Sequence, residues 1–259
     1  MYYKVNNARL YVNSKGNGDL SLIFLHFWGG SSRTWQQVTS LLENNFRCIT
    51  IDFRGWGASD KTDNGYEIQS LANDVLTVVE QMQLDNYILV GHSMGGKVAQ
   101  AIAARKPAGL KKMILVAPSP AFATILPVEM VETMENAYTT LDNINATIDH
   151  VFRASDISAP LRQIIIEDMQ QHSTASRLAW PAGALAEDVS EGLEDIDIPV
   201  VIIAGEHDIV DPPARLQVEV ADVIPGSRMI IMPAVGHLIM VQKPSEIAVL
   251  INEFCRTRK

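Results

Sequence analysis

Three kinds of side chain in this 259-residue sequence could together break a carbonyl bond: a serine, a carboxylate and a histidine. The serine is part of Gly91-His92-Ser93-Met94-Gly95, where an apolar run ends and a pattern of small residues with helical spacing begins. Glycines on both sides relieve crowding, so that a strand can turn directly into a helix with the serine at its tip. The positive end of the following helix then lies beneath the hydroxyl. This pattern is typical of a nucleophilic serine.

A serine hydroxyl is too weak an acid to attack a carbonyl unaided. It needs an imidazole to take its proton, and the imidazole needs a carboxylate that fixes its tautomer and stabilises its cation. Two later apolar runs end in suitable residues: Glu206, Asp208 and Asp211 after the first, and His237 after the second. In an open parallel sheet, function collects at the carboxyl ends of the strands. We therefore expect His237 and one of these carboxylates, Asp208 first, to lie near Ser93.

The hydrophobic pattern indicates which elements position these groups. After a predicted N-terminal hairpin, apolar runs alternate with stretches of helical spacing, which implies right-handed crossovers and a parallel sheet. We therefore predict an α/β fold: a mostly parallel, twisted, eight-stranded sheet with helices on both faces. The expected strands are residues 2–5, 8–12, 20–26, 46–52, 87–90, 113–117, 199–204 and 228–232.

The alternation stops between about residues 118 and 197, where only helical patterns occur. No Pro-, Gly- or Ser-rich linker and no change in composition marks a separate unit there. We therefore expect residues 1–118 and 198–259 to form a core domain, with a helical cap of residues 119–197 inserted after the sixth strand. Its expected helices are residues 128–138, 144–152, 160–171 and 175–185.

Composition excludes several functional classes. The net charge is −9 and the basic residues are scattered, which argues against binding to a nucleic-acid backbone. No apolar run is long enough for a membrane helix, and the first residues do not resemble a signal peptide, so a cytoplasmic protein without a membrane partner is expected. Cys48 and Cys255 do not make a disulfide framework, the histidines lack metal-ligand spacing, and no dinucleotide fingerprint is present. We therefore expect neither a metal nor a cofactor.

Five segments in this order resemble those of the α/β-hydrolase fold superfamily: His26-Phe27-Trp28-Gly29-Gly30, residues 52–60, residues 91–96, residues 205–208 and Gly236-His237. The resemblance covers essentially the whole chain. It implies that Ser93 is the nucleophile, that His237 acts first as general base and then as general acid, and that Asp208 is the orienting carboxylate.

The resemblance also implies an oxyanion hole built from two backbone N–H groups. One belongs to Met94, the residue after the nucleophile, and the other to the loop after His26, where Trp28 is the best candidate. Many relatives carry glycine where this chain has Phe27. The backbone angles of this loop decide which N–H group points inward.

Other polar residues near these motifs are expected to be structural. His26 and His92 should anchor the loop and the turn that contain them, and Asp211 should begin a helix because two prolines follow it. We expect Asp52, Arg54 and Asp60 to form a network that braces the loop after residue 52. We expect His150 and His172 to lie on the surface. Six residues could line an apolar substrate pocket or simply belong to the core: Phe27, Phe122, Trp180, Ile209, Val210 and Leu238.

The expected function is hydrolysis of a small to medium, uncharged carboxylic ester or lactone through an acyl-enzyme on Ser93. The same constellation serves cofactor-free perhydrolases and haloperoxidases, in which peroxide replaces water, and hydrolases of carbon–carbon bonds. A ligand-sensing protein with an intact but slow triad is an alternative of another class. Fold does not choose the substrate, and the sequence leaves both a monomer and a homodimer open.

Overall fold

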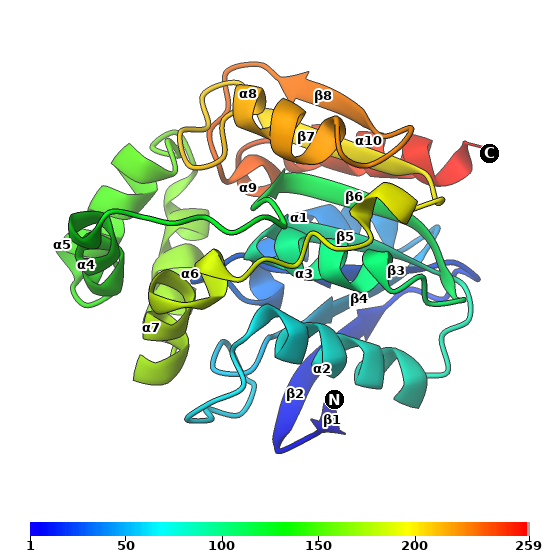
Figure 1. Ribbon diagram of the computed structural model, residues 1–259, viewed down its shortest axis with the longest axis horizontal. Helices are drawn as coiled ribbons and strands as arrows, with labels where there is room; N and C mark the ends of the chain where they lie inside the picture. Colours follow the sequence, from blue (N-terminus) through cyan, green and yellow to red (C-terminus); the bar gives the residue numbers. More distant parts are fainter. Residues whose placement is uncertain (258–259) are drawn as a thin grey trace.

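An eight-stranded sheet runs through the computed structural model, which describes residues 1–257 (Figure 1). The strand order is β1-β2-β4-β3-β5-β6-β7-β8. The pairs β1–β2 and β2–β4 are antiparallel, and all the others are parallel. The mostly parallel eight-stranded sheet predicted from the sequence is thus confirmed. The strands are β1 Tyr2–Val5, β2 Ala8–Lys15, β3 Ser21–Leu25, β4 Arg47–Ile51, β5 Tyr87–Ser93, β6 Leu110–Pro118, β7 Val200–Gly205 and β8 Arg228–Met232.

The central strands are apolar because both of their faces are covered. Every residue of β3, β5 and β7 is buried, as expected for parallel strands between two layers of helices. Parallel pairing also aligns the ends of neighbouring strands, so that Leu25 lies opposite Gly91 and Gly205 opposite Met232. The loops that follow β3, β5, β7 and β8 therefore meet at one edge of the sheet.

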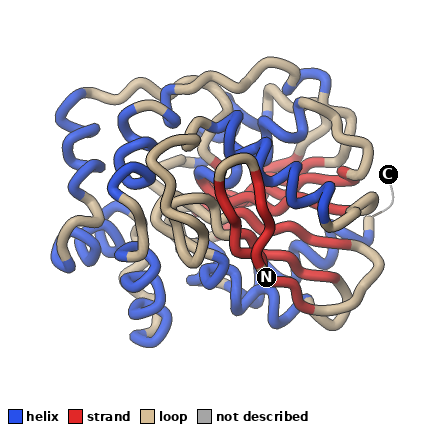
Figure 2. Tube along the Cα trace, turned by 90° about the horizontal axis from the view of Figure 1, so that it is seen from below, coloured by secondary structure: helices blue, strands red, loops and turns tan. Residues whose placement is uncertain are grey.

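Helices cover both faces of the sheet, with α2 and α3 packed together on one face and α1 and α10 on the other (Figures 1 and 2). The buried residues of α2 recur every three or four positions, so that one apolar stripe faces the strands. Within residues 1–257, no helix has both the length and the apolar character needed to cross a bilayer. These helices are α1 Gln36–Leu42, α2 Ile68–Gln81, α3 Met94–Ala104, α8 Pro213–Leu216, α9 Ile239–Gln242 and α10 Pro244–Arg256.

Residues 119–197, here called the inserted segment, contain helices, turns and loops but no strand. Its α-helices are α4 Val128–Asn136, α5 Leu141–Ala146, α6 Ala159–Gln170 and α7 Thr174–Ala182, and they lie together beside one end of the sheet (Figure 1).

Two predicted helices are shorter than expected because each ends in a wider π turn. In place of the helix predicted over 144–152, α5 is followed by a π turn at Thr147–Val151. In place of the helix expected after Asp211, α8 is followed by a π turn at Gln217–Ala221. In the first turn the Phe152 N–H donates to the Thr147 carbonyl, five residues earlier. The chain then bends, and the Phe152 carbonyl is free to accept a bond from another part of the molecule.

Candidate active site

Ser93 lies at the junction of β5 and α3 in a strained backbone conformation, with φ 51° and ψ −117°. Non-glycine residues rarely adopt positive φ, and such strain clusters at functional sites. The flanking glycines are required by space: a Cβ on Gly91 would lie 2.4 Å from the Gly95 carbonyl oxygen, and one on Gly95 would lie 2.5 Å from the Leu25 oxygen. The strand-to-helix turn expected from the sequence is therefore present.

His237 and Asp208 face each other in the buried interior, with His237 Nδ1 2.7 Å from Asp208 Oδ2. The other carboxylate oxygen, Oδ1, accepts the backbone N–H groups of Val210 at 2.8 Å and Asp211 at 3.2 Å. On the opposite side, the His237 backbone N–H donates to the Phe152 carbonyl at 2.8 Å. Both the ring and the backbone of the histidine are thus held in one orientation.

The carboxylates around His237 raise its pKa by more than burial lowers it. Burial alone lowers the pKa of His237, but the charge and hydrogen bond of Asp208 and the charge of Asp211 raise it, and the net pKa lies above the ordinary value of 6.5. The Phe152 ring stacks on the imidazole at a centroid distance of 5.3 Å. A stabilised imidazolium beside an oriented carboxylate is what a general base needs.

His92 joins the serine turn to the histidine loop. Its Nε2 lies 2.9 Å from the His237 carbonyl oxygen, and because a carbonyl only accepts, Nε2 must carry the proton. Burial lowers the pKa of His92 well below its usual value, so the ring is neutral. The residue before Ser93 is therefore hydrogen-bonded to the backbone of His237, which agrees with the structural role expected for His92.

The loop after β3 is held by His26. Its Nδ1 donates to the Phe27 carbonyl at 2.7 Å, and its Nε2 accepts the Phe53 N–H at 3.0 Å. The Phe27 carbonyl also accepts the Gly30 N–H at 3.0 Å. No cis peptide occurs in residues 1–257, so the Trp28 N–H points away from the fixed Phe27 carbonyl. Among the hydrogen bonds of this described part, none has the Trp28 N–H as donor.

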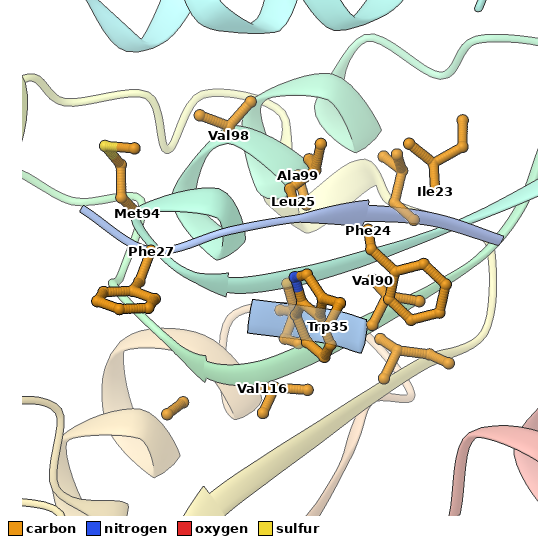
Figure 3. Close-up of a cluster of buried hydrophobic side chains, with 14 of the residues drawn as sticks. Ile23, Phe24, Leu25, Phe27, Trp35, Val90, Met94, Val98, Ala99 and Val116 are labelled. Atoms are coloured by element: carbon orange, nitrogen blue, oxygen red, sulfur yellow. The ribbon is translucent and has the colours of Figure 1, made fainter. Parts of the chain in front are cut away.

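Met94 is the first residue of α3, so its N–H has no acceptor within the helix. Its side chain is buried and, like that of Phe27, belongs to the hydrophobic cluster that Figure 3 shows. The two N–H groups expected to form an oxyanion hole therefore belong to the loop after β3 and the helix after β5, which are adjacent strands.

The six expected pocket residues differ in their surroundings. Phe27 packs edge-on against His92 and Phe152, at centroid distances of 5.2 and 5.6 Å, and so belongs to the aromatic cluster around His237. Leu238 and Trp180 are also buried, Phe122 and Val210 are half-buried, and Ile209 is 53% exposed. A cavity of about 370 Å³ lies elsewhere, between β2, β4 and α6. Within residues 1–257, no cluster of three or more His, Cys, Asp or Glu side chains could hold a metal ion.

Asp211 differs from the expectation that it begins a helix. Helix α8 begins at Pro213 with Pro212 as its N-cap, and the buried Asp211 carboxylate instead accepts Arg215 Nη1 at 3.2 Å. Burial raises the pKa of Asp211 to about 7. Sequence reasoning missed this second buried carboxylate beside His237, although the four-residue spacing from Arg215 was a signal for it. Glu206 is exposed and accepts the Ala234 N–H.

Of three further expectations, the structure corrects one, agrees with one and refines one. His172 lies between α6 and α7, half-buried in an isolated bridge with Trp56, because the chain turns back onto the core there; it is not a helical surface residue. His150 is exposed as expected. The predicted bracing network is three separate contacts: Asp52 with the N–H groups of Ser32 and Ala58, Arg54 with Asp74, and Asp60 with Arg9.

Known proteins resemble this chain over almost its whole length. The AB hydrolase superfamily protein YisY of Bacillus subtilis is 29% identical, with 96% of both chains covered. The pimeloyl-[acyl-carrier protein] methyl ester esterase of Pectobacterium atrosepticum is 27% identical, with 92% of this chain and 94% of the esterase covered. The crystal structure of a bromoperoxidase from Bacillus anthracis has the same fold, with a TM-score of 0.90 at 22% identity over 99% of both chains.

The sequence profile of one family also matches directly. It is described as the alpha/beta hydrolase family, and the match runs over residues 22–250, from β3 into the last helix. That range includes the serine turn, the loop after β3 and both strand-end loops. The chain therefore belongs to the alpha/beta hydrolase family.

Proposed function

We propose that the protein is a serine hydrolase that cleaves small to medium, uncharged carboxylic esters or lactones through an acyl-enzyme on Ser93. The observation that carries this proposal is the 2.7 Å contact between His237 Nδ1 and the buried Asp208. His92, the residue before Ser93 in the strained turn, is hydrogen-bonded to the His237 carbonyl and so joins the turn to this pair. An esterase among the relatives supports ester chemistry. The net charge of −9 disfavours polyanionic substrates.

In the first half of the proposed reaction, Ser93 Oγ attacks the substrate carbonyl carbon while His237 Nε2 takes the hydroxyl proton. The carbonyl oxygen becomes an oxyanion, which the N–H groups of Met94 and Trp28 stabilise as it forms. His237 then gives its proton to the leaving alkoxide, and the carbon–oxygen bond of the ester breaks. Asp208 stabilises the imidazolium throughout but keeps its own negative charge.

In the second half, a water molecule attacks the acyl-enzyme carbonyl, and His237 Nε2 takes one of its protons. The same two N–H groups stabilise the second oxyanion. This intermediate collapses, the bond to Ser93 Oγ breaks, and the proton returns from His237 to the serine. A carboxylic acid leaves; a lactone gives a single hydroxy acid because its alcohol remains attached.

We further propose that the inserted segment acts as a cap that selects the substrate. It reaches the loop after β3 directly, because the Trp28 indole N–H donates to the Arg177 carbonyl of α7 at 3.1 Å. Of the six expected pocket residues, Phe122 and Trp180 belong to this segment, whereas Phe27, Ile209, Val210 and Leu238 come from the core. A pocket between the two parts would be apolar, which suits uncharged acyl groups.

The test is hydrolysis of acetyl, butyryl and octanoyl nitrophenyl esters and of an acyl lactone. The parent should turn over at least one of them, Ser93→Ala should lose essentially all activity, and Ser40→Ala, which removes an exposed hydroxyl from α1, should match the parent. Ser93→Ala retaining the activity of the parent, or a parent inert toward the whole panel, would overturn the proposal. The acyl chain length that is hydrolysed fastest would then indicate the length of the substrate pocket.

A further inference from the structure

Two hydrogen bonds tie Trp28 to the inserted segment, one through its backbone and one through its side chain. The Tyr138 hydroxyl donates to the Trp28 carbonyl at 2.8 Å, and the Trp28 indole N–H donates to the Arg177 carbonyl at 3.1 Å. Tyr138 follows α4 and is 110 residues away in sequence. The residue expected to supply one oxyanion N–H is therefore held from outside the core.

Together with the core, Tyr138 fixes both peptide planes that flank Trp28. The plane between Phe27 and Trp28 is held by the His26 ring and the Gly30 N–H, which both bind the Phe27 carbonyl. The plane between Trp28 and Gly29 is held by the Tyr138 hydroxyl. The Trp28 N–H lies in the first plane, and the second plane holds the Trp28 Cα at the end of that first plane. Neither φ nor ψ of Trp28 can therefore change without disturbing one of these bonds.

Packing leaves the Tyr138 ring little freedom. Its centroid lies 4.3 Å from that of Trp28 and 6.3 Å from that of Trp56, and only 3% of the residue is exposed. The ring also lies against Gly29, where φ is +98° and a Cβ would come within 2.7 Å of it. Burial raises the pKa of Tyr138 well above its usual value, so the hydroxyl stays a donor at any working pH.

We propose that Tyr138 is a positioning residue for the oxyanion hole: by holding the Trp28 carbonyl it restrains the Trp28 backbone, and so helps to keep the Trp28 N–H directed toward the developing negative charge. The inserted segment then completes the catalytic machinery as well as covering it. This inference rests on the proposed function and names a residue that the triad does not include. In this loop the positive φ falls at Gly29, at +98°, and not at Phe27.

Tyr138→Phe tests the inference, because it removes the hydroxyl and keeps the ring. A matched control is Tyr66→Phe, which removes another buried tyrosine hydroxyl that donates to a backbone carbonyl, that of Thr62. The first readout is labelling of Ser93 by a fluorophosphonate. In that reaction a bond forms between Ser93 Oγ and phosphorus, fluoride leaves, His237 takes the proton, and the phosphoryl oxygen occupies the oxyanion hole.

Labelling by the Tyr138→Phe variant should be slower by about tenfold, less than the loss seen when an oxyanion donor is deleted outright. For esters that the parent cleaves, kcat should fall by a similar factor with KM nearly unchanged. Tyr66→Phe should stay within about twofold of the parent in both measurements. A purely structural role for Tyr138 would lower the melting temperature without changing either rate constant.

Hydrogen exchange provides a second readout that does not depend on catalysis. The amides of Trp28 to Gly30 should exchange faster in Tyr138→Phe than in the parent, and not faster in Tyr66→Phe. If the parent is labelled, and labelling and exchange are both unchanged in Tyr138→Phe, then this inference alone is overturned. A parent whose Ser93 does not react would instead refute the proposed function, and this inference with it.

Discussion

The helix that follows the serine and the first helix of the inserted segment are built in opposite ways. In α3, every residue from Met94 to Ala103 is buried, whereas α4 has no buried residue. Val128 and Met130 of α4 are 68% and 51% exposed. The two helices have similar lengths, so the difference lies in what surrounds them.

Helix α3 packs against β5, β6 and α2, and its glycine and alanine residues allow close approach. Helix α4 packs mainly against α7, another helix of the inserted segment. Few buried apolar contacts give a low local stability. The proposed chemistry therefore rests on a helix that is buried almost throughout, while part of the region proposed to select the substrate is a helix without a buried residue.

The inserted segment is nevertheless fixed at its two ends. Lys97 of α3 is buried, and its Nζ donates to the Phe122 carbonyl at 3.0 Å and to the Leu185 carbonyl at 2.9 Å. Burial lowers the pKa of Lys97 to about 8. Arg215 also reaches Thr124, with Nη2 2.6 Å from its hydroxyl. These bonds join the segment to the core near both of its ends, whereas no residue of α4 is buried.

After the loss of Ser93 itself, the largest effect is expected from the core carboxylate. Asp208→Asn should lower kcat by about 10⁴-fold, because the amide cannot stabilise the imidazolium and favours the wrong tautomer of His237. Steady-state kinetics on the best nitrophenyl ester would measure it. Glu129→Gln, which removes an exposed carboxylate from α4, is the control and should behave like the parent. A loss of less than tenfold in Asp208→Asn would mean that another group, Asp211 first, orients the histidine.

The contrast in packing predicts a contrast in stability. Ile102→Ala in α3 removes a fully buried side chain and should lower the free energy of unfolding by about 2–5 kcal/mol. Val128→Ala in α4 should change it by less than about 0.5 kcal/mol, because the side chain is mostly exposed. Urea titration of both variants gives the two values. Equal losses would show that α4 is packed more tightly than its exposure indicates.

A smaller effect concerns pH. The proposed base must be neutral, and the pKa of His237 is raised above 6.5, so kcat/KM should fall as the pH drops through that raised value. Asp211→Asn removes one of the charges that raise this pKa and should move the midpoint to lower pH. Glu129→Gln, on α4, should not move it. A midpoint below 6.5 in the parent, or no shift in Asp211→Asn, would contradict this account of the site.

Much of the fold was predictable because it depends on local patterns. Apolar runs interrupted by helical spacing were enough to predict the parallel sheet and the helices on its faces, and the strands lie close to the expected ranges. The π turns after α5 and α8 were not predictable, because their hydrogen bonds differ from those of an α-helix by one residue while the apolar spacing stays the same. The half-buried position of His172 was also missed, since it depends on contact with Trp56, far away in sequence.

The sequence by itself determined the serine turn, because the cause of that turn is steric and lies within five residues. It also determined that the loops after β5, β7 and β8 meet, because parallel strands end at one edge of the sheet. Only the tertiary structure decided which carboxylate lies against His237. Glu206, Asp208 and Asp211 share one short loop, and it is the turn of that loop that directs Asp208 inward and leaves Glu206 exposed. The contacts of Phe152 with His237 and of Tyr138 with Trp28 likewise join residues far apart in the chain. Such contacts depend on how the whole inserted segment packs, which no local pattern of residues specifies.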